Sequence, residues 1–421
     1  MTSATERVVI VGAGQAGGRA AEALRGAGFA GEVMLIGEEH HAPYERPRLS
    51  KSVLLGEEPS DAATIHPREW YAAHGVRLRT GSRVEAIAPR SRTVITAEGE
   101  RIEYSRLLLC TGSRVRPLTG APEGLPGVHY LRTCDDAERL AAELLPGRRL
   151  VVIGGGFIGL EVASSALKRG LAVTVVERQA ALLDRVLPAP IASRIASLHT
   201  ANGVALRLGV AVSRICSDGA GNGTLRSVAL ADGSELPADL VVIGIGIIPN
   251  TELAESAGAA SSDGLVVDEY CRTTLENVYA AGDVTSHYNA ILGRHVRLES
   301  WQNAQNQAIA AARSIAAAAG GEAARPYAEV PWFWSDQLGA NIQMAGVTEP
   351  GMEIVWRGER LAFGLLDGRL RLAVAFNQGA EIRVARRLIE SRAQLPASRL
   401  ADSGTRLKDL LTEAACSASI P

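Results

Sequence analysis

The chain has 421 residues, which is more than one hydrophobic core usually supports, so two or three domains are expected. Hydrophobic residues make up 47% of it and aromatic residues only 4%, alongside 44 glycines. This composition favours a sheet-and-helix protein rich in small residues over an all-β protein. A formal net charge of -2 gives no electrostatic reason to expect binding to nucleic acid or to an anionic membrane.

The sequence pattern shows no targeting signal, membrane span or metal site. No apolar run approaches the roughly 20 residues of a membrane helix, and the opening MTSATER leads directly into a predicted strand. We therefore expect a cytoplasmic protein. The adjacent His40 and His41 belong to a predicted loop. The cysteines are odd in number and lack C-x-x-C spacing, so neither a disulfide framework nor a zinc site is expected: Cys110, Cys134, Cys216, Cys271 and Cys416.

A glycine-rich turn follows the first predicted strand, the apolar run Val8–Val11. Gly12, Gly14 and Gly17 come directly after it with the spacing G-x-G-x-x-G. In this pattern Gly12 permits a sharp turn, Gly14 lets the backbone approach a pyrophosphate, and Gly17 lets a helix pack on the strand. The N-terminus of that helix offers free amides and a positive dipole end to the pyrophosphate.

An acidic residue follows the second predicted strand, Glu32–Ile36. Glu38 lies 21 positions beyond Gly17, where it is placed to accept hydrogen bonds from the ribose of an adenine dinucleotide. A glycine turn alone can equally serve strand–helix packing. Here the strand, the spacing, the helix and the acid agree on dinucleotide binding.

The segment after Glu38 is predicted to be a loop that contains two prolines and closes at Lys51. Prolines stiffen a backbone at low entropy cost, so this loop is suited to hold Lys51 against a cofactor, although a loop lysine is more often a plain surface residue. Short strands are expected across 76–110, and the last of them ends before Thr111 and Gly112. The chain is expected to leave its first domain at that point.

The opening pattern occurs a second time in the middle of the chain. Gly154, Gly156 and Gly159 keep the G-x-G-x-x-G spacing after an apolar run, and Glu177 ends the next predicted strand. Two dinucleotide sites are therefore expected. An acid in the ribose position favours NAD over its 2′-phosphorylated form, whereas the adjacent Arg178 would suit that phosphate, so the strength of the preference stays open.

Two later segments are predicted to return the chain to the first domain. Residues 236–247 form an apolar stretch that reads as a strand, and a short strand at Tyr279–Ala281 ends in Gly282 and Asp283. A carboxylate beside a glycine at a strand end can receive a ribityl or sugar hydroxyl. Asp283 is equally suited to cap the following helix.

An alanine-rich helix is predicted over 301–319, where Gly320 and Gly321 end it. A third region begins at residue 325, and its 12 Lys/Arg against 11 Asp/Glu do not indicate a broad basic docking surface. Its predicted elements are strands at Ile342–Val347, Ile354–Arg357 and Leu370–Phe376, followed by helices over 379–391 and 405–415.

Five motifs together resemble a known family. GAGQAG, GGGFIG, CTGSR, AAGDV and PWFWSDQ resemble the flavin-dependent ferredoxin reductases of the putidaredoxin reductase and biphenyl dioxygenase reductase type, along nearly the whole chain. The resemblance implies an α/β fold with two Rossmann-like domains of the glutathione-reductase type and a C-terminal α+β domain. The implied boundaries are 1–113 with 247–324 for FAD, 114–246 for NAD and 325–421 for the C-terminal reductase domain.

The resemblance also implies the cofactor contacts. The positions that match FAD contacts are Gly12, Gly14, Ala16, Gly17, Glu38, Lys51, Val84, Thr111, Gly112, Arg132, Asp283 and Trp301. The positions that match contacts of NADH are Gly154, Gly156, Phe157, Ile158, Gly159, Glu161, Glu177 and Gly246. Lys51 and Glu161 are similar to the family's ion pair beside the flavin ring, and the resemblance implies that they are the catalytic residues. Buried charges are tolerated when paired, so this pair can tune the flavin and position the nicotinamide.

The implied activity is electron transfer from NADH to a ferredoxin. NADH gives FAD two electrons as hydride, which the protein assists by stacking the two rings, and FAD passes them on singly. The implied acceptor is a small two-iron two-sulfur ferredoxin that feeds a haem monooxygenase or a ring-hydroxylating dioxygenase. Trp332 and Trp334 resemble the family's partner-facing aromatic residues, although alternating aromatics in a strand more often belong to a core.

Two alternatives use the same cofactors. An NADH oxidase or a disulfide reductase of this fold is the first, but disulfide reductases carry a C-x-x-x-x-C pair after the acidic strand, and no cysteine precedes Cys110. The second is a flavoprotein similar to apoptosis-inducing factor, in which NADH switches partner binding instead of driving turnover. Such proteins usually carry an organelle-targeting segment before the first strand, for which this sequence is expected to leave no room.

Overall fold

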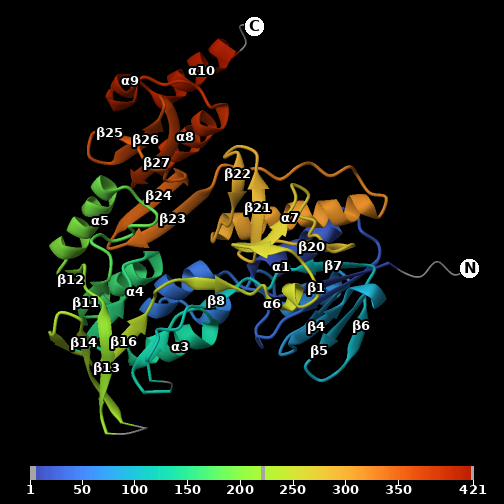
Figure 1. The fold of residues 1–421 in the computed structure, drawn as a ribbon, viewed down its shortest axis with the longest axis horizontal. Coiled ribbons are helices and arrows are strands. Elements are labelled where there is room, and N and C mark those ends of the chain that lie inside the picture. The colour runs from blue at the N-terminus through green and yellow to red at the C-terminus, as the bar shows by residue number, and fades with distance from the viewer. Residues whose placement is uncertain (1–5, 123, 220–222, 419–421) are drawn as a thin grey trace, which may run out of the picture. The chain divides into compact units, whose positions relative to one another are not determined.

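A computed structural model describes residues 6–122, 124–219 and 223–418 (Figure 1). The chain forms two compact units, and each is built from separate segments. The first unit holds the chain up to Pro47, Pro59–Arg114 and Ile247–Glu329, and the second holds Arg48–Glu58, Val115–Gly246 and the chain from Val330 onward. The three-domain division implied by the sequence stays a prediction.

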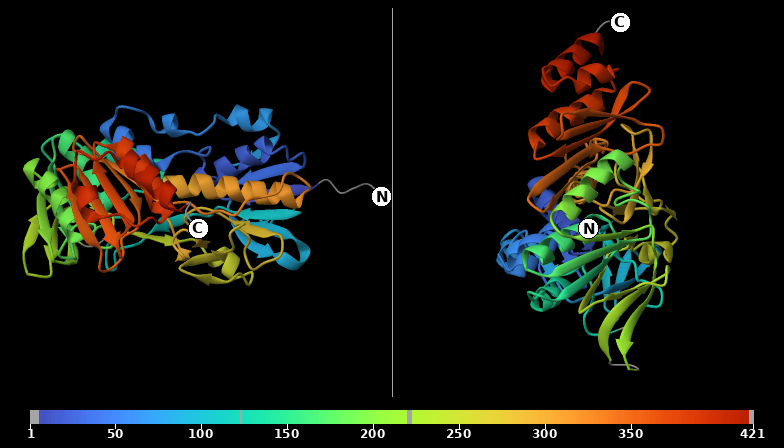
Figure 2. Two further views of the ribbon diagram at one scale, coloured as in Figure 1. Left: turned by 90° about the horizontal axis from the view of Figure 1, so that it is seen from above. Right: turned by 90° about the vertical axis from the view of Figure 1, so that its left-hand side faces the viewer.

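The first unit is organised on a five-stranded parallel sheet with the order β20-β7-β1-β2-β3. Its strands are β20 (Val278–Ala280), β7 (Arg106–Leu109), β1 (Arg7–Val11), β2 (Glu32–Ile36) and β3 (Val76–Arg79). Because side chains alternate along a strand, Val8 and Ile10 of β1 face the core with α1 (Gln15–Gly26) and α7 (Trp301–Ala318). Figure 2 shows α7 as one unbroken orange helix, as its alanine-rich sequence predicts.

The other face of this sheet is covered by shorter strands. Val9 and Val11 of β1 face a second core, which they share with Val84, Ile102 and Leu265. Two small sheets surround this core: β4 (Val84–Ala88), β5 (Thr93–Thr96) and β6 (Arg101–Glu103), and β18 (Ser261–Ser262), β19 (Gly264–Val267), β21 (Thr285–Asn289) and β22 (Arg294–Val296). The helices α2 (Arg68–Ala73) and α6 (Glu252–Glu255) complete the unit.

The second unit contains a parallel sheet of the same design, with the order β12-β11-β10-β16-β9. Its strands are β12 (Ala205–Leu208), β11 (Ala172–Glu177), β10 (Arg149–Ile153), β16 (Leu240–Ile243) and β9 (Val128–Tyr130). As in the first sheet, the central strand precedes a glycine turn and pairs with the strand that leads to the predicted ribose-binding acid. The predicted internal repeat is therefore confirmed, and its helices are α3 (Cys134–Glu143), α4 (Phe157–Lys168) and α5 (Ala189–Ala201).

One predicted strand is divided among three strands. The apolar stretch 236–247 was expected to run continuously, but β16 ends at Ile243 and β17 (Ile247–Pro249) belongs to a separate two-stranded sheet with β8 (Ser113–Val115). Gly246, which has a φ of +111° between them, breaks the strand because that conformation leaves the sheet geometry. The first residues of the stretch belong to β15 (Glu235–Pro237), which forms a separate antiparallel sheet with β13 (Val212–Asp218) and β14 (Thr224–Leu230).

The C-terminal part of the second unit is α+β, as predicted. Its five antiparallel strands follow the order β23-β24-β27-β26-β25, with α8 (Gly379–Ser391) packed on β24 and β27 (orange to red in Figure 2). The strands are β23 (Trp332–Gln337), β24 (Ala340–Gly346), β25 (Glu353–Arg357), β26 (Leu361–Leu366) and β27 (Arg369–Phe376), and the last helices are α9 (Ala397–Ala401) and α10 (Leu407–Ala418). Among the described residues, no helix combines the length and apolar character that crossing a bilayer requires.

The segment that carries Lys51 is helical, which corrects the predicted loop. A 3-10 turn covers Arg46–Arg48, and a π-helical turn covers Leu49–Val53. Pro47 is compatible with a helical turn of this kind, since its φ is already close to helical and the first turn of a helix has no use for its missing N–H. Lys51 therefore projects from a turn whose Leu49 and Val53 side chains are buried.

Candidate functional site

Each unit has a glycine turn at the end of its central strand, and only glycine fits there. Gly12 and Gly154 have φ values of +108° and +110°. A Cβ at Gly12 would lie 2.0 Å from the carbonyl oxygen of Cys110, and one at Gly154 would lie 2.3 Å from that of Gly244. These contacts are impossible for a real Cβ, so the neighbouring strand and the turn can approach closely only because both residues are glycine.

The helix behind each turn is packed just as closely. A Cβ at Gly17 would lie 1.9 Å from the carbonyl oxygen of Gly12, and one at Gly159 would lie 2.2 Å from that of Gly154. The third glycine of each motif is therefore required for helix–strand packing, as the sequence predicted. This result alone fits a purely structural turn.

The second glycine of each motif distinguishes a binding turn from a structural one. A Cβ at Gly14 or at Gly156 would meet no atom within 4 Å. Both residues cap helices, α1 and α4, with φ values of -91° and -81° that any residue can adopt. Neither packing nor backbone geometry therefore requires glycine there, whereas a pyrophosphate close to the first-turn amides does.

The two predicted ribose-binding acids have different surroundings. Glu38 lies on the surface of the first unit, where its carboxylate is 2.9 Å from the Arg83 guanidinium. Glu177 in the second unit accepts hydrogen bonds from the backbone N–H of Gly155 (2.7 Å) and of Gln179 (2.8 Å). Glu177 thus fixes the glycine turn of its own site, and each of its oxygens keeps a second lone pair for a hydroxyl donor.

Asp283 lies beside the first glycine turn. It follows Gly282, whose φ is +86° and whose Cβ, if present, would lie 3.1 Å from the Cβ of Ala16 in the first turn of α1. Gln307 of α7 accepts the Gly282 N–H at 2.9 Å, and Ser113 donates to the Asp283 carboxylate at 3.0 Å. This carboxylate is therefore held at the end of the parallel sheet near α1, as a receptor for a cofactor hydroxyl would be.

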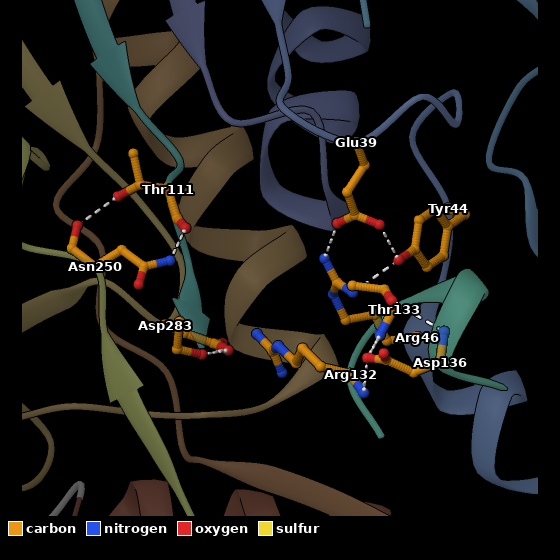
Figure 3. A network of polar contacts seen from close by, with 10 residues as sticks. Glu39, Tyr44, Arg46, Thr111, Arg132, Thr133, Asp136, Asn250 and Asp283 are labelled. Atoms are coloured by element: carbon orange, nitrogen blue, oxygen red, sulfur yellow. Dashed lines mark hydrogen bonds and ion pairs between the residues drawn. The ribbon is translucent and has the colours of Figure 1, made fainter. Parts of the chain in front are cut away.

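Thr111 and Gly112 are fixed by a residue that the sequence did not identify. Thr111 donates to the Asn250 carbonyl, and the Asn250 amide donates to the Thr111 carbonyl, both at 2.9 Å (Figure 3). The Asn250 N–H also bonds the carbonyl oxygen of Gly112. The two segments on which the chain leaves and re-enters the first unit are thereby joined beside Asp283 (Figure 3).

A second cluster in the first unit is formed by Glu39, Tyr44 and Arg46 (Figure 3). Arg46 lies 2.7 Å from one oxygen of the Glu39 carboxylate, and Tyr44 donates to the other at 2.6 Å. This cluster begins shortly after the end of β2 and holds the segment that leads to Pro47. The sequence did not single out these three residues.

The remaining FAD candidates lie at well-defined but different places. Arg132 of the second unit precedes the capping box of α3, in which the Asp136 carboxylate accepts the N–H groups of Arg132 and Thr133 at 3.0 and 2.9 Å (Figure 3). In the first unit, Val84 is buried in the core beneath the parallel sheet, and Trp301 is the half-buried first residue of α7. Core packing is therefore sufficient to explain an apolar residue at Val84.

The predicted ion pair is formed within the second unit. The Lys51 ammonium lies 2.8 Å from the Glu161 carboxylate, and the side chains are 20% and 2% exposed. Glu161 also accepts hydrogen bonds from Ser50 and, at 2.6 Å, from Ser335. Three donors therefore surround a carboxylate that is almost fully buried, and their hydrogen bonds offset the loss of its contact with water.

The predicted nicotinamide-cofactor contacts surround the start of α4. Phe157 packs against Phe333, with ring centroids 4.5 Å apart, whereas Ile158 is 45% exposed. Nearly half of the Ile158 side chain in the first turn of this helix is thus accessible to a ligand. Gly246 lies near two cations, because a Cβ there would be 3.6 Å from Arg185 and 4.0 Å from Arg116.

Trp332 and Trp334 lie on one face of β23 and are half-buried. Their rings are stacked, with centroids 5.2 Å apart, and the Trp332 indole N–H donates to Gln343 at 3.3 Å. Phe333, between them, points to the opposite face and packs against the core of the unit. The two tryptophans therefore lie outside the core, which leaves the partner-facing prediction open to test.

Two cysteine thiols and the positions of possible metal ligands limit the thiol and metal chemistry that the described residues can support. Burial raises the pKa of the Cys110 thiol and of the Cys271 thiol well above the usual range. Both are therefore poor sources of thiolate. Within the described part of the chain, no group of three His, Cys, Asp or Glu side chains is arranged to hold a metal.

Comparisons with known proteins place these features in context. A family model described as pyridine nucleotide-disulphide oxidoreductase matches residues 6–308, and one described as reductase C-terminal matches residues 332–411. The chain is 42% identical to the anthranilate 1,2-dioxygenase system ferredoxin--NAD(+) reductase component of Burkholderia cepacia, over 96% of this chain and 98% of the relative. It is 36% identical to putidaredoxin reductase of Pseudomonas putida, over 98% of each. The reductase in the crystal structure of a covalent putidaredoxin reductase–putidaredoxin complex superposes with a TM-score of 0.94 at 35% identity, over 98% of this chain and all of that one.

Proposed function

Because the chain belongs to the pyridine nucleotide-disulphide oxidoreductase family, we propose that it is an FAD-dependent enzyme that takes electrons from NADH and delivers them to a ferredoxin. The observation that carries this proposal is the pair of glycine turns. Each has an opening at its second glycine, Gly14 or Gly156, that neither packing nor backbone conformation explains. Two dinucleotides account for two such openings.

We assign FAD to the first turn and NADH to the second. Asp283, held by Ser113 beside α1, is suited to accept a ribityl hydroxyl of FAD, and Glu38 is suited to the adenosine ribose. Glu177 in the second unit favours the ribose of NADH, because its carboxylate would repel a 2′-phosphate. Lys51 and Glu161 are the proposed catalytic pair on the family resemblance.

The chain's own residues bind the two cofactors and hold the Lys51–Glu161 pair in place. FAD, when bound, supplies the chemistry that takes two electrons from NADH and releases them one at a time. Glu161 holds the Lys51 ammonium in one place, and the donors around Glu161 keep its carboxylate fixed. The buried thiols of Cys110 and Cys271 are poor sources of thiolate, so we assign neither of them a role in electron transfer to a disulfide.

We further propose that the acceptor is a two-iron two-sulfur ferredoxin that supplies a haem monooxygenase or a ring-hydroxylating dioxygenase, in the cytoplasm. The names of the relatives support this assignment, since they are reductase components of dioxygenase systems and a reductase of putidaredoxin. Trp332 and Trp334 are the proposed partner-facing residues. An obligate one-electron acceptor also matches a sequence in which no C-x-x-x-x-C pair follows the first acidic strand.

A coupled assay tests this function. The protein is purified with FAD, and reduction of cytochrome c by NADH is followed with and without a two-iron two-sulfur ferredoxin. We expect a yellow protein and reduction that depends on the ferredoxin. A colourless chain that cannot be reconstituted with FAD, or NADH oxidation that ferredoxin does not alter, would contradict the proposal.

A further inference from the structure

The buried carboxylate of Glu161 is the end of a longer polar chain in the second unit. Ser335 of β23 donates to Glu161, and its hydroxyl in turn accepts from the Gln337 amide at 2.8 Å. The Gln337 carbonyl oxygen is 2.9 Å from Nε2 of His199 on α5. Ser335, Gln337 and His199 are at most 1% exposed, so water does not compete for these bonds.

The chemistry of the atoms gives this chain one direction. An amide oxygen can only accept, so His199 must carry its proton on Nε2 and donate to Gln337. The Gln337 amide N–H then donates to Ser335, whose single proton goes to the Glu161 carboxylate. Each donor thus points toward the negative charge, an arrangement in which each bond polarises and strengthens the next.

His199 is suited to its place at the start of the chain. Burial lowers its pKa, which keeps the ring neutral, although the hydrogen bond to Gln337 acts in the opposite direction. Its Nδ1 has no hydrogen-bond partner among the described residues. A neutral ring with its proton on Nε2 leaves only an acceptor unsatisfied, whereas an imidazolium would bury an unpaired N–H with a charge.

The strand that carries the chain also carries the two tryptophans. Ser335 and Gln337 alternate with Trp334 on β23, so the polar pair faces Glu161 while the indole rings point the other way. Ser164, one turn beyond Glu161 on α4, accepts the Leu338 N–H at 2.7 Å and anchors the end of the same strand. The unit therefore has one contact that places the strand and another that donates to the carboxylate.

We propose that Ser335, Gln337 and His199 are positioning residues that orient Glu161, and through it Lys51, for the reaction with NADH. The inference rests on the proposed function, in which Lys51 and Glu161 form the catalytic pair. It adds that the hydrogen-bond chain, rather than packing of β23 alone, keeps that pair in its reactive arrangement. The C-terminal strand thereby contributes to the chemistry of the nucleotide-binding part of the same unit.

The test compares Ser335→Ala with Ser164→Ala in the holoenzyme. Anaerobic stopped-flow measurement of flavin reduction by NADH separates the limiting rate from the NADH concentration that gives half of it. We expect Ser335→Ala to lower the limiting rate about tenfold, since it removes a hydrogen bond to a charged group, and to leave the half-saturating concentration within about twofold. Ser164→Ala removes a strand anchor without touching the donors, so its limiting rate should stay within about twofold of wild type.

Two His199 variants probe the far end of the chain. His199→Gln keeps a donor at the position of Nε2 and should retain the wild-type limiting rate within about twofold, whereas His199→Phe should lower it about threefold. Nitrogen-15 NMR of histidine gives a readout without activity. The His199 signal, assigned by its loss in His199→Gln, should show a proton on Nε2 in wild type and a changed Nε2–H shift in Ser335→Ala.

Several results would overturn the inference. If Ser164→Ala slows reduction as much as Ser335→Ala, strand placement explains the effect. If Ser335→Ala keeps the wild-type rate, or His199 carries its proton on Nδ1, the donor chain does not exist as described. Should His199→Phe fail to fold, the comparison of the two serine variants and the NMR result still decide. Failure of the proposed function is recognised separately, because wild-type flavin would then not be reduced by NADH while the NMR measurement still tests the chain.

Discussion

Glu177 is the residue on which we expect nucleotide preference to depend. Its carboxylate accepts two backbone N–H groups, so truncation to alanine would loosen the turn as well as remove the charge. Glu177→Gln keeps an acceptor of the same size and isolates the charge. We expect the preference for NADH over NADPH, measured as the ratio of kcat/KM values, to fall about tenfold in Glu177→Gln.

Arg178 supplies the control for this prediction. It is an exposed neighbour that would suit a 2′-phosphate, so Arg178→Ala should lower kcat/KM for NADPH and leave that for NADH within about twofold. An unchanged ratio of kcat/KM for NADH and NADPH in Glu177→Gln would show that Glu177 only holds the turn and does not distinguish the two nucleotides.

His287 makes stability depend on pH. It is 1% exposed, neither ring nitrogen has a hydrogen-bond partner among the described residues, and burial, with a smaller effect of His295, lowers its pKa to about 4. In the unfolded chain this side chain takes up a proton near pH 6.5, whereas in the folded protein it does so only near pH 4. The free energy of unfolding is therefore unaffected by His287 above pH 6.5 and decreases as the pH falls toward 4. We expect the free energy of unfolding to drop by about 2 kcal/mol between pH 7.5 and pH 5 from this residue.

Urea unfolding of the wild type and of His287→Leu at these two pH values measures the effect as a difference. The leucine variant should lose about 2 kcal/mol less stability on acidification than the wild type. His40→Gln, at an exposed position, should behave like the wild type. An equal pH dependence in His287→Leu would mean that His287 is protonated in the folded state.

At the scale of the element, strand β23 presents two faces with different tasks. Trp332 and Trp334 are half-buried and outside the core, whereas Phe333 packs on Phe157. If the tryptophans contact the ferredoxin, Trp332→Ala or Trp334→Ala should slow ferredoxin reduction at least about tenfold. Reduction of ferricyanide, which needs no docking surface, should stay within about twofold.

Phe333→Leu is the matched control on the opposite face. It should lower the Tm by about 2–4 °C through lost packing and leave the ratio of ferredoxin to ferricyanide rates unchanged. Equal losses in both assays for the tryptophan variants would assign Trp332 and Trp334 to structure.

Sequence patterns predicted the elements that depend on local chemistry. Both glycine turns and their strands follow from spacing, because the close contacts at Gly12 and Gly154 admit no other residue. Strand β26 was missed, since its residues are buried on both faces and show no alternation. The turn that holds Lys51 was taken for a loop because its prolines indicated one.

The polar partners of the site were the least predictable part. Ser50, Ser335 and Asn250 are ordinary residues in sequence, and only the fold brings Ser335 to Glu161 across 174 positions. The PWFWSDQ segment did contain an indication of this contact. Ser335 and Gln337 are two positions apart in a strand and therefore share one face of it. A polar pair on the inner face of an apolar strand indicates a buried partner.

For the molecule as a whole, we expect activity that does not depend on free thiols. Cys110, Cys134 and Cys271 are buried, and burial raises the pKa of the Cys110 and Cys271 thiols. Treatment of the NADH-reduced enzyme with iodoacetamide should therefore leave at least about 80% of ferredoxin reduction. A disulfide reductase treated in parallel is the positive control and should lose its activity. Inactivation of this protein at the same rate would reveal a reactive dithiol.

The most direct measurement is the stoichiometry of electron delivery under anaerobic conditions. The holoenzyme is mixed with limiting NADH and excess two-iron two-sulfur ferredoxin, and both are followed by absorbance. Two nucleotide sites that feed a single-electron acceptor predict two ferredoxins reduced for each NADH consumed. NADH that reduces FAD but passes no electrons to the ferredoxin, leaving a long-lived complex, would contradict the account.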